Sequence, residues 1–157
     1  MSEYAKIFRK YNEDSTLEVS MDLYNPDEKK YKDLIIEKKH NGFKQVIINS
    51  EIMIEIIKES LVKNGLVQVI SFTDNTDEEI IDDVNRLLWK IRENKVYFEE
   101  LKKLLSWALD KNSIDIKETI IYFGQQQYNI RSNGLIIGKE KEDFFKEIIE
   151  PVIRRYL

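Results

Sequence analysis

One group of residues in this sequence has the types and order needed to hold a divalent metal ion. Asp27 follows Pro26 in a predicted turn, and Glu37 stands two positions before Lys39. Two carboxylates can bind a divalent cation that activates water, and a lysine can steady the negative charge that develops on a phosphate. Asp22 could supply the first carboxylate in place of Asp27. The candidate catalytic residues for such chemistry are Asp22, Asp27, Glu37 and Lys39.

The letters of this group resemble the PD-(D/E)xK pattern of metal-dependent nucleases. The elements predicted around it, in the order αβββαβ, are also similar to the core of that family. The resemblance implies phosphodiester cleavage assisted by a divalent metal. Glu37 departs from the family pattern because it falls on the second predicted strand rather than on the third.

Most other catalytic chemistries lack the residues that they require. The chain has no cysteine and a single histidine, His40, so neither a thiol nucleophile, a serine triad nor a histidine-rich zinc site is supported. The acidic run 74–83 lacks the glycine and the glutamate spacing of an EF-hand. We therefore predict no cofactor and no bound metal.

One tryptophan is a candidate anchor for a protein partner. Trp89 lies about 180° from the apolar stripe of its predicted helix, and interface hot spots are enriched in tryptophan. Asp77, Glu78 and Asp82 begin the same helix, where acids either complement the helix dipole or face a basic partner. These four residues are the candidate partner-binding set.

The composition is that of a globular protein with a well-solvated surface. Of 157 residues, 42% are hydrophobic and 34% charged, and the predicted unit is one domain, 1–157. A net charge of −4 gives no long-range attraction for phosphate, so nucleic-acid binding would need a local basic patch and nucleic acid is not the expected partner. The chain begins without a signal sequence and has no run long enough to span a bilayer, which predicts a cytoplasmic protein without membrane association.

Hydrophobic periodicity and turn signals predict the elements along the chain. The first half reads as a helix over 3–12, a strand over 17–23, a hairpin over 31–49 around Asn41-Gly42, a helix over 51–64 ending at Gly65, and a strand over 66–72. That hairpin would place Lys39 opposite Lys44, a like-charge pair that costs stability.

The second half reads as two helices and a hairpin followed by a closing helix. A capping pattern starts one helix near Asp77, and a break within 92–95 separates it from the next. Strands over 119–123, 128–131 and 135–137 follow, with a hairpin turn at Asn133-Gly134 that would pair Ile130 with Ile137. Pro151 should kink or restart the closing helix.

The resulting order, αβββαβααβββα, predicts an α+β fold in which an antiparallel sheet with Asn-Gly hairpins packs against amphipathic helices. Hairpin-plus-helix units ending near 64 and 157 could form a pseudo-repeat. The order is similar to that of acidic type III secretion chaperones, which are small dimers, and this resemblance rests on topology alone.

The function hypothesis that follows is a small acidic protein-binding module, such as an inhibitor, an immunity protein or antitoxin, or a chaperone. It would act by covering a partner's surface without catalysis, and a homodimer is left open. The metal-dependent nuclease and a structural subunit of a larger assembly are the alternatives.

Overall fold

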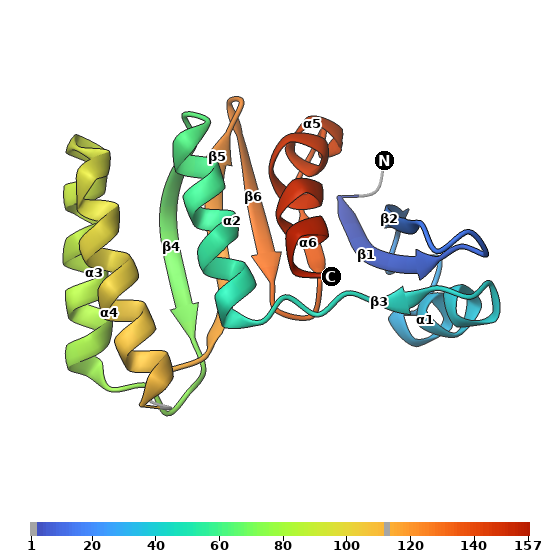
Figure 1. Cartoon of the computed structure of the whole chain (residues 1–157), viewed down its shortest axis with the longest axis horizontal. Coiled ribbons are helices and arrows are strands. Elements are labelled where there is room, and N and C mark those ends of the chain that lie inside the picture. Colours follow the sequence, from blue (N-terminus) through green and yellow to red (C-terminus); the bar gives the residue numbers. More distant parts are fainter. Residues whose placement is uncertain (1–2, 112–113) are drawn as a thin grey trace.

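The computed structural model describes residues 3–111 and 114–157, which build one antiparallel sheet with helices around it (Figure 1). The strands follow the order β2-β1-β7-β6-β5-β4, and β3 also pairs with β1. Their bounds are β1 Tyr4–Tyr11, β2 Leu17–Tyr24, β3 Lys44–Gln45, β4 Leu66–Phe72, β5 Ile116–Phe123, β6 Gln126–Arg131 and β7 Leu135–Ile137. All pairings are antiparallel, so the predicted α+β class is confirmed.

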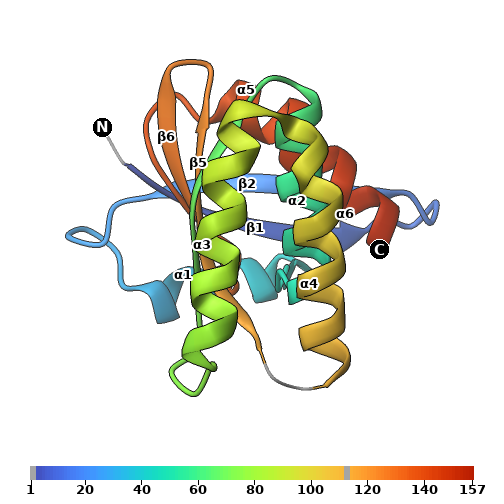
Figure 2. The ribbon, with the colours of Figure 1, turned by 90° about the vertical axis from the view of Figure 1, so that its left-hand side faces the viewer.

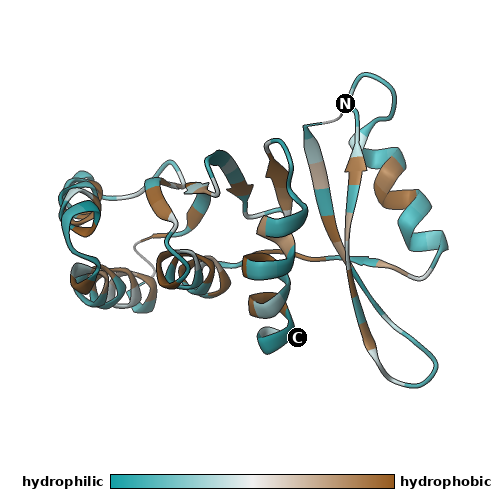
Figure 3. Cartoon of the chain, turned by 90° about the horizontal axis from the view of Figure 1, so that it is seen from above, coloured by the Kyte–Doolittle hydropathy of each residue, from teal (hydrophilic) through white to brown (hydrophobic). Residues whose placement is uncertain are grey.

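The helices are distributed unequally over the two faces of this sheet. Their bounds are α1 Tyr31–His40, α2 Ser50–Val62, α3 Glu78–Glu93, the 3-10 turn η1 Lys95–Tyr97, α4 Phe98–Asp110, α5 Glu142–Phe144, the π-helical turn η2 Phe145–Ile149 and α6 Glu150–Tyr156. Viewed from above, α2 and α6 lie along one side of the sheet (Figure 3), and the α3–α4 pair stands at its β4 end (Figure 2). We call the face under α2 and α6 the inner face and the opposite one the outer face.

Two apolar clusters hold these layers together. The larger one joins the inner face to α2, α4 and the closing helix, with Ile57, Leu101 and Ile148 fully buried. A second, smaller cluster fastens α1 to the outer face of β1 and β2 through Phe8, Tyr24, Leu34 and Leu135. The outer face is therefore covered at its β1–β2 end.

Several predictions for the second half are confirmed. Asn94 lies between α3 and η1 and accepts a hydrogen bond from the Val96 amide, which is the break expected within 92–95. In the closing helix, the π-helical turn ends two residues before Pro151. Proline has no N–H for the carbonyl four residues earlier, and the Lys63 ammonium donates to that Glu147 oxygen instead at 2.7 Å.

The helix predicted over 3–12 is wrong, because residues 4–11 form β1. The i, i+3, i+4 spacing of its apolar residues imitates a helix, whereas the strand is covered on both faces. Ala5 and Ile7 are buried on one side, and Lys6 and Phe8 are buried on the other. A strand buried on both sides loses the alternation by which strands are recognised.

The hairpin predicted over 31–49 is also wrong. Residues 31–40 are helix α1, and Asn41-Gly42 ends it: the Phe43 amide bonds to the Lys38 carbonyl and the Gly42 amide to the Lys39 carbonyl. This is the Schellman arrangement, with Gly42 at φ +85°. The two halves of the chain therefore do not share a hairpin-plus-helix unit.

Two turns differ from expectation by one residue. The Asn133-Gly134 turn connects β6 to β7, but the register pairs Ile130 with Ile136, because three residues rather than two form the connection. Asn64, not Gly65, takes the left-handed conformation after α2. In the described ranges, no helix is long and apolar enough to cross a membrane.

Candidate functional site: an uncovered sheet face

The outer face of β4, β5 and β6 carries apolar side chains that no described element covers. Leu66, Val69 and Tyr122 are 37%, 39% and 39% exposed, and Ile120 is half-buried between them. The other side of the same strands is the inner face, where Thr119 and Ile121 are fully buried. A two-layer α+β protein ordinarily keeps the solvent side of its sheet polar.

These residues and their half-buried or polar neighbours on β6 and β7 form continuous rows because the strands are in register. One row runs Val69, Ile120, Asn129 and Ile137 across β4, β5, β6 and β7. A second row runs Leu66, Tyr122 and Gln127. We call these seven residues the open-face rows.

Near the start of β5 and the end of β6, the rows meet a polar group that includes Asn129 of the first row. Asn129 Nδ2 donates to Glu118 Oε1 at 3.0 Å, and Arg131 Nε lies 3.5 Å from the same oxygen. Next to this group is a hollow of about 460 Å³ lined by Lys117, Glu118, Arg131, Ser132 and Asn133. Apolar rows beside an ordered polar cluster and a hollow resemble the centre and rim of a protein interface.

The sequence analysis did not single out this surface, although a signal for it exists. In β5 both alternating sets are apolar, Ile120 and Tyr122 on one side and Ile121 and Phe123 on the other. Such a strand needs cover on both faces. The structure provides cover on one face only.

Trp89 lies where the helix periodicity places it. It is 68% exposed on α3, opposite the buried stripe, and the guanidinium of Arg92 lies 4.6 Å from its ring centroid. Trp107 on α4 is 54% exposed. Each is a single aromatic on a helix surface.

The acidic residues at the start of α3 have separate roles. The Asp77 carboxylate caps the helix by accepting from the Glu79 amide at 2.9 Å. Glu78 and Asp82 are exposed and form no ion pair with any residue that the structure describes. Asp77 thus has a structural task, and the other two remain free for a partner.

The structure gives two of the candidate nuclease residues cationic partners of their own. Glu37 lies on α1, where the sequence had predicted a strand, and pairs with Lys29, which lowers the pKa of its carboxyl. Asp22 on β2 pairs with Lys38 Nζ at 3.0 Å. Asp27 lies in the turn before α1, as expected, and Lys39 lines a separate pocket. No group of three potential metal ligands occurs among residues 3–111 and 114–157.

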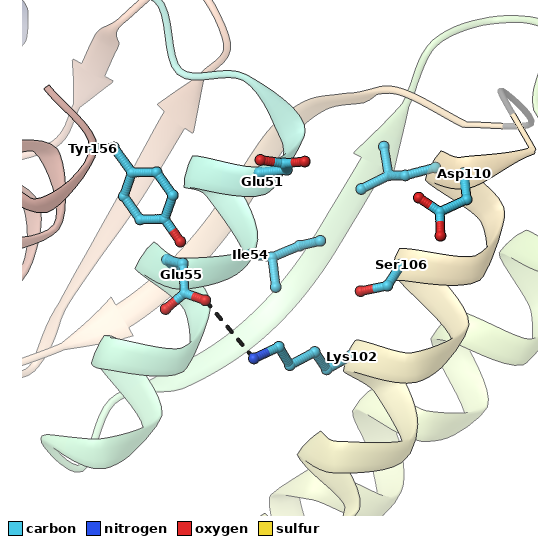
Figure 4. Close-up of a pocket in the computed structure, with 8 residues that line it drawn as sticks. Glu51, Ile54, Glu55, Lys102, Ser106, Asp110 and Tyr156 are labelled. Carbon is cyan, nitrogen blue, oxygen red and sulfur yellow. Dashed lines mark ion pairs between the residues drawn. The ribbon is translucent and has the colours of Figure 1, made fainter.

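A groove between α2 and α4 is lined by polar side chains that sequence analysis did not connect (Figure 4). Its volume is about 240 Å³, and Glu51, Ile54, Glu55, Lys102, Ser106, Leu109, Asp110 and Tyr156 line it. Lys102 Nζ lies 3.8 Å from Glu55 Oε1.

The side chains of this groove do not form a catalytic arrangement for nucleophilic attack. Burial first, and then the nearby carboxylates of Glu55 and Glu51, raise the pKa of the Tyr156 hydroxyl. Ser106 has no hydrogen-bonded base among the described side chains that could activate it as a nucleophile. The groove is a polar seam between two helices.

Comparison with family models, with curated proteins and with solved structures finds no match to this chain.

Proposed function

We propose that this chain is a protein-binding module that docks through its open-face rows and acts by covering its partner's surface, without catalysis. The observation that supports this function is the apolar outer face of β4–β6, centred on Val69, Ile120 and Tyr122 and left uncovered by the described elements. An apolar surface that spans several strands favours burial against another surface. Inhibitor, immunity protein, antitoxin and chaperone-like roles all fit this mode of action, as does a homodimer.

The rows are a better docking surface than Trp89. Isolated exposed apolar residues are common on soluble proteins, whereas contiguous ones are not. Val69 and Tyr122 stand on neighbouring strands whose backbones are fixed by hydrogen bonds, so little conformational entropy is lost when a partner binds. Trp89, in contrast, already contacts the Arg92 guanidinium.

Two variants with the same kind of substitution separate these surfaces. Val69→Lys/Tyr122→Lys places two charges in the rows, and Trp89→Lys/Trp107→Lys places two charges on α3 and α4. The tagged proteins are used to capture partners from the native cells, and each captured partner's affinity is then measured with purified components. Circular dichroism and melting temperature verify that each variant is folded.

The row variant should bind the partner at least roughly 30-fold more weakly, which corresponds to the about 2 kcal/mol of an interface hot spot. The helix variant should bind almost normally. The opposite pattern would move the docking surface to α3 and α4 and contradict the proposal. If sedimentation shows a concentration-dependent dimer that the row variant abolishes, the partner is a second copy of the chain.

The enzyme alternative, a metal-dependent nuclease, has less support, because Glu37 pairs with Lys29 and Asp22 pairs with Lys38. It requires metal-dependent cleavage of nucleic acid that Glu37→Ala abolishes in a folded protein.

A further inference from the structure

A pocket at the end of α1 combines an apolar floor with lysines. It has a volume of about 310 Å³, and its lining residues are Phe8, Ile35, Lys39, Gly42, Phe43, Lys44 and Gln45. This volume lies at the small end of the range of about 300–1,000 Å³ that is usual for ligand pockets. Its only charged lining residues are the two lysines.

Further cations surround this pocket. Lys38 Nζ lies 3.9 Å from the centroid of the Phe43 ring, and Lys10 Nζ lies 5.3 Å from it. Lys38 pairs with Asp22, but Lys10, Lys39 and Lys44 form no ion pair with any described residue. In a chain of net charge −4, these side chains form the local basic patch that nucleic-acid binding would require.

One pair of like charges beside this pocket destabilises the protein when no ligand is bound. Arg9 stands directly opposite Lys44 in the β1–β3 register, and like charges in that position destabilise a strand pair. Lys39 and Lys44 were expected to repel each other across a hairpin, and both instead line one pocket, Lys39 from α1 and Lys44 from β3.

One lining side chain offers hydrogen bonds without charge. The Gln45 carbonyl oxygen accepts from the Tyr31 hydroxyl at 3.1 Å, which fixes the amide and leaves its two N–H groups as donors. An apolar floor, a fixed amide and lysines at the rim match the three parts of a nucleotide: the flat base, its polar edge and the phosphate.

We propose that this pocket binds a nucleotide base and that Lys39 and Lys44 hold the adjoining phosphate, either in a free nucleotide or in a single strand of nucleic acid. The site lies on α1 and β3 and does not rest on the function proposed for the open-face rows. Binding here involves no hydrolysis.

The test uses the full chain and a fluorescein-labelled 12-nucleotide single strand, followed by anisotropy at several salt concentrations. Each lysine–phosphate contact contributes about −0.7 to the slope of log K against log salt for a single strand. Lys39→Gln/Lys44→Gln should therefore reduce the slope by about 1.4 and weaken binding about 25-fold at 0.1 M salt. Lys103→Gln/Lys146→Gln removes two exposed charges elsewhere and should change neither.

Three further measurements complete the test. Gln45→Ala should weaken binding while leaving the salt slope unchanged, because no charge is lost. Calorimetry with AMP distinguishes the sources: binding of AMP assigns a free nucleotide, and binding of the strand alone assigns nucleic acid. Binding of neither probe, equal losses in both lysine variants, or equally tight binding of a 12-residue polyglutamate peptide would overturn the proposal.

Discussion

The buried ammonium of Lys6 makes the stability of this protein depend on pH in a specific way. Lys6 is fully buried on β1, donates to the backbone oxygen of Asn133, and lies 3.5 Å from that of Val46. It forms no ion pair with a described carboxylate, and burial lowers the pKa of Lys6 from 10.5 to about 8. Between these two values the unfolded chain holds a proton on Lys6 that the folded chain has lost. Stability must therefore rise with pH in that window.

The size of this effect follows from the two pKa values. The full shift corresponds to about 3 kcal/mol, and about 2 kcal/mol of it should be regained between about pH 7.5 and 9.5. Urea unfolding at these two pH values measures it. In Lys6→Met, whose unbranched apolar side chain is one atom shorter, the part of this rise that Lys6 contributes should be absent.

Other groups whose pKa values are shifted in the folded chain also contribute to the pH dependence of stability. Burial lowers the pKa of Lys141, and it raises the pKa values of Tyr24, Tyr31 and Tyr128. They contribute to both proteins, so only the difference between wild type and variant reports on Lys6. The same rise in the wild type and in Lys6→Met would refute the reasoning.

Four further substitutions test local features, each by urea unfolding. Gly134→Ala should lower the free energy of unfolding by about 2 kcal/mol or more, because φ is +82° and a Cβ would overlap the Val46 carbonyl oxygen. Gly124→Ala, at φ +57° with no atom near its Cβ, should lower it by about 1 kcal/mol. Equal losses in the two variants would contradict this. Thr119→Val should stabilise the protein by up to about 1 kcal/mol, since the buried hydroxyl has no hydrogen-bond partner among the described residues; a clear loss would reveal a partner. Asp77→Ala should cost about 1 kcal/mol through the lost cap of α3, and an unchanged midpoint would show that the cap is dispensable.

The sequence predicted those elements whose local pattern has one physical explanation. Ile80, Val84, Leu87, Leu88 and Ile91 recur with helical spacing and are all buried in α3. One apolar stripe facing one core is the simplest case of burial. The same geometry places Trp89 opposite this stripe, and the structure shows that its side chain is 68% exposed.

The wrong predictions of secondary structure share one cause, which is burial by elements distant in the sequence. β1 has apolar residues on both sides because α1 covers one side and the main core the other, and no local pattern reports this. Asn-Gly favours left-handed backbone in general, and whether it connects strands at 133–134 or ends a helix at 41–42 depends on what the flanking residues pack against.

The candidate sites predicted from the sequence were affected by these wrong assignments of secondary structure. Because residues 31–40 form a helix and not a strand, Glu37 pairs with Lys29. Lys39 lines the same pocket as Lys44. The open-face rows combine residues from β4, β5, β6 and β7, so the two apolar sides of β5 could indicate the surface, but its extent required the strand order.

Carbene footprinting of the complex with its captured partner, analysed by mass spectrometry, tests the central claim most directly. Labelling of Val69, Ile120 and Tyr122 should fall sharply on binding, while labelling of Trp89 and Trp107 stays unchanged. Unchanged labelling of the open-face rows together with protection of the two tryptophans would contradict it.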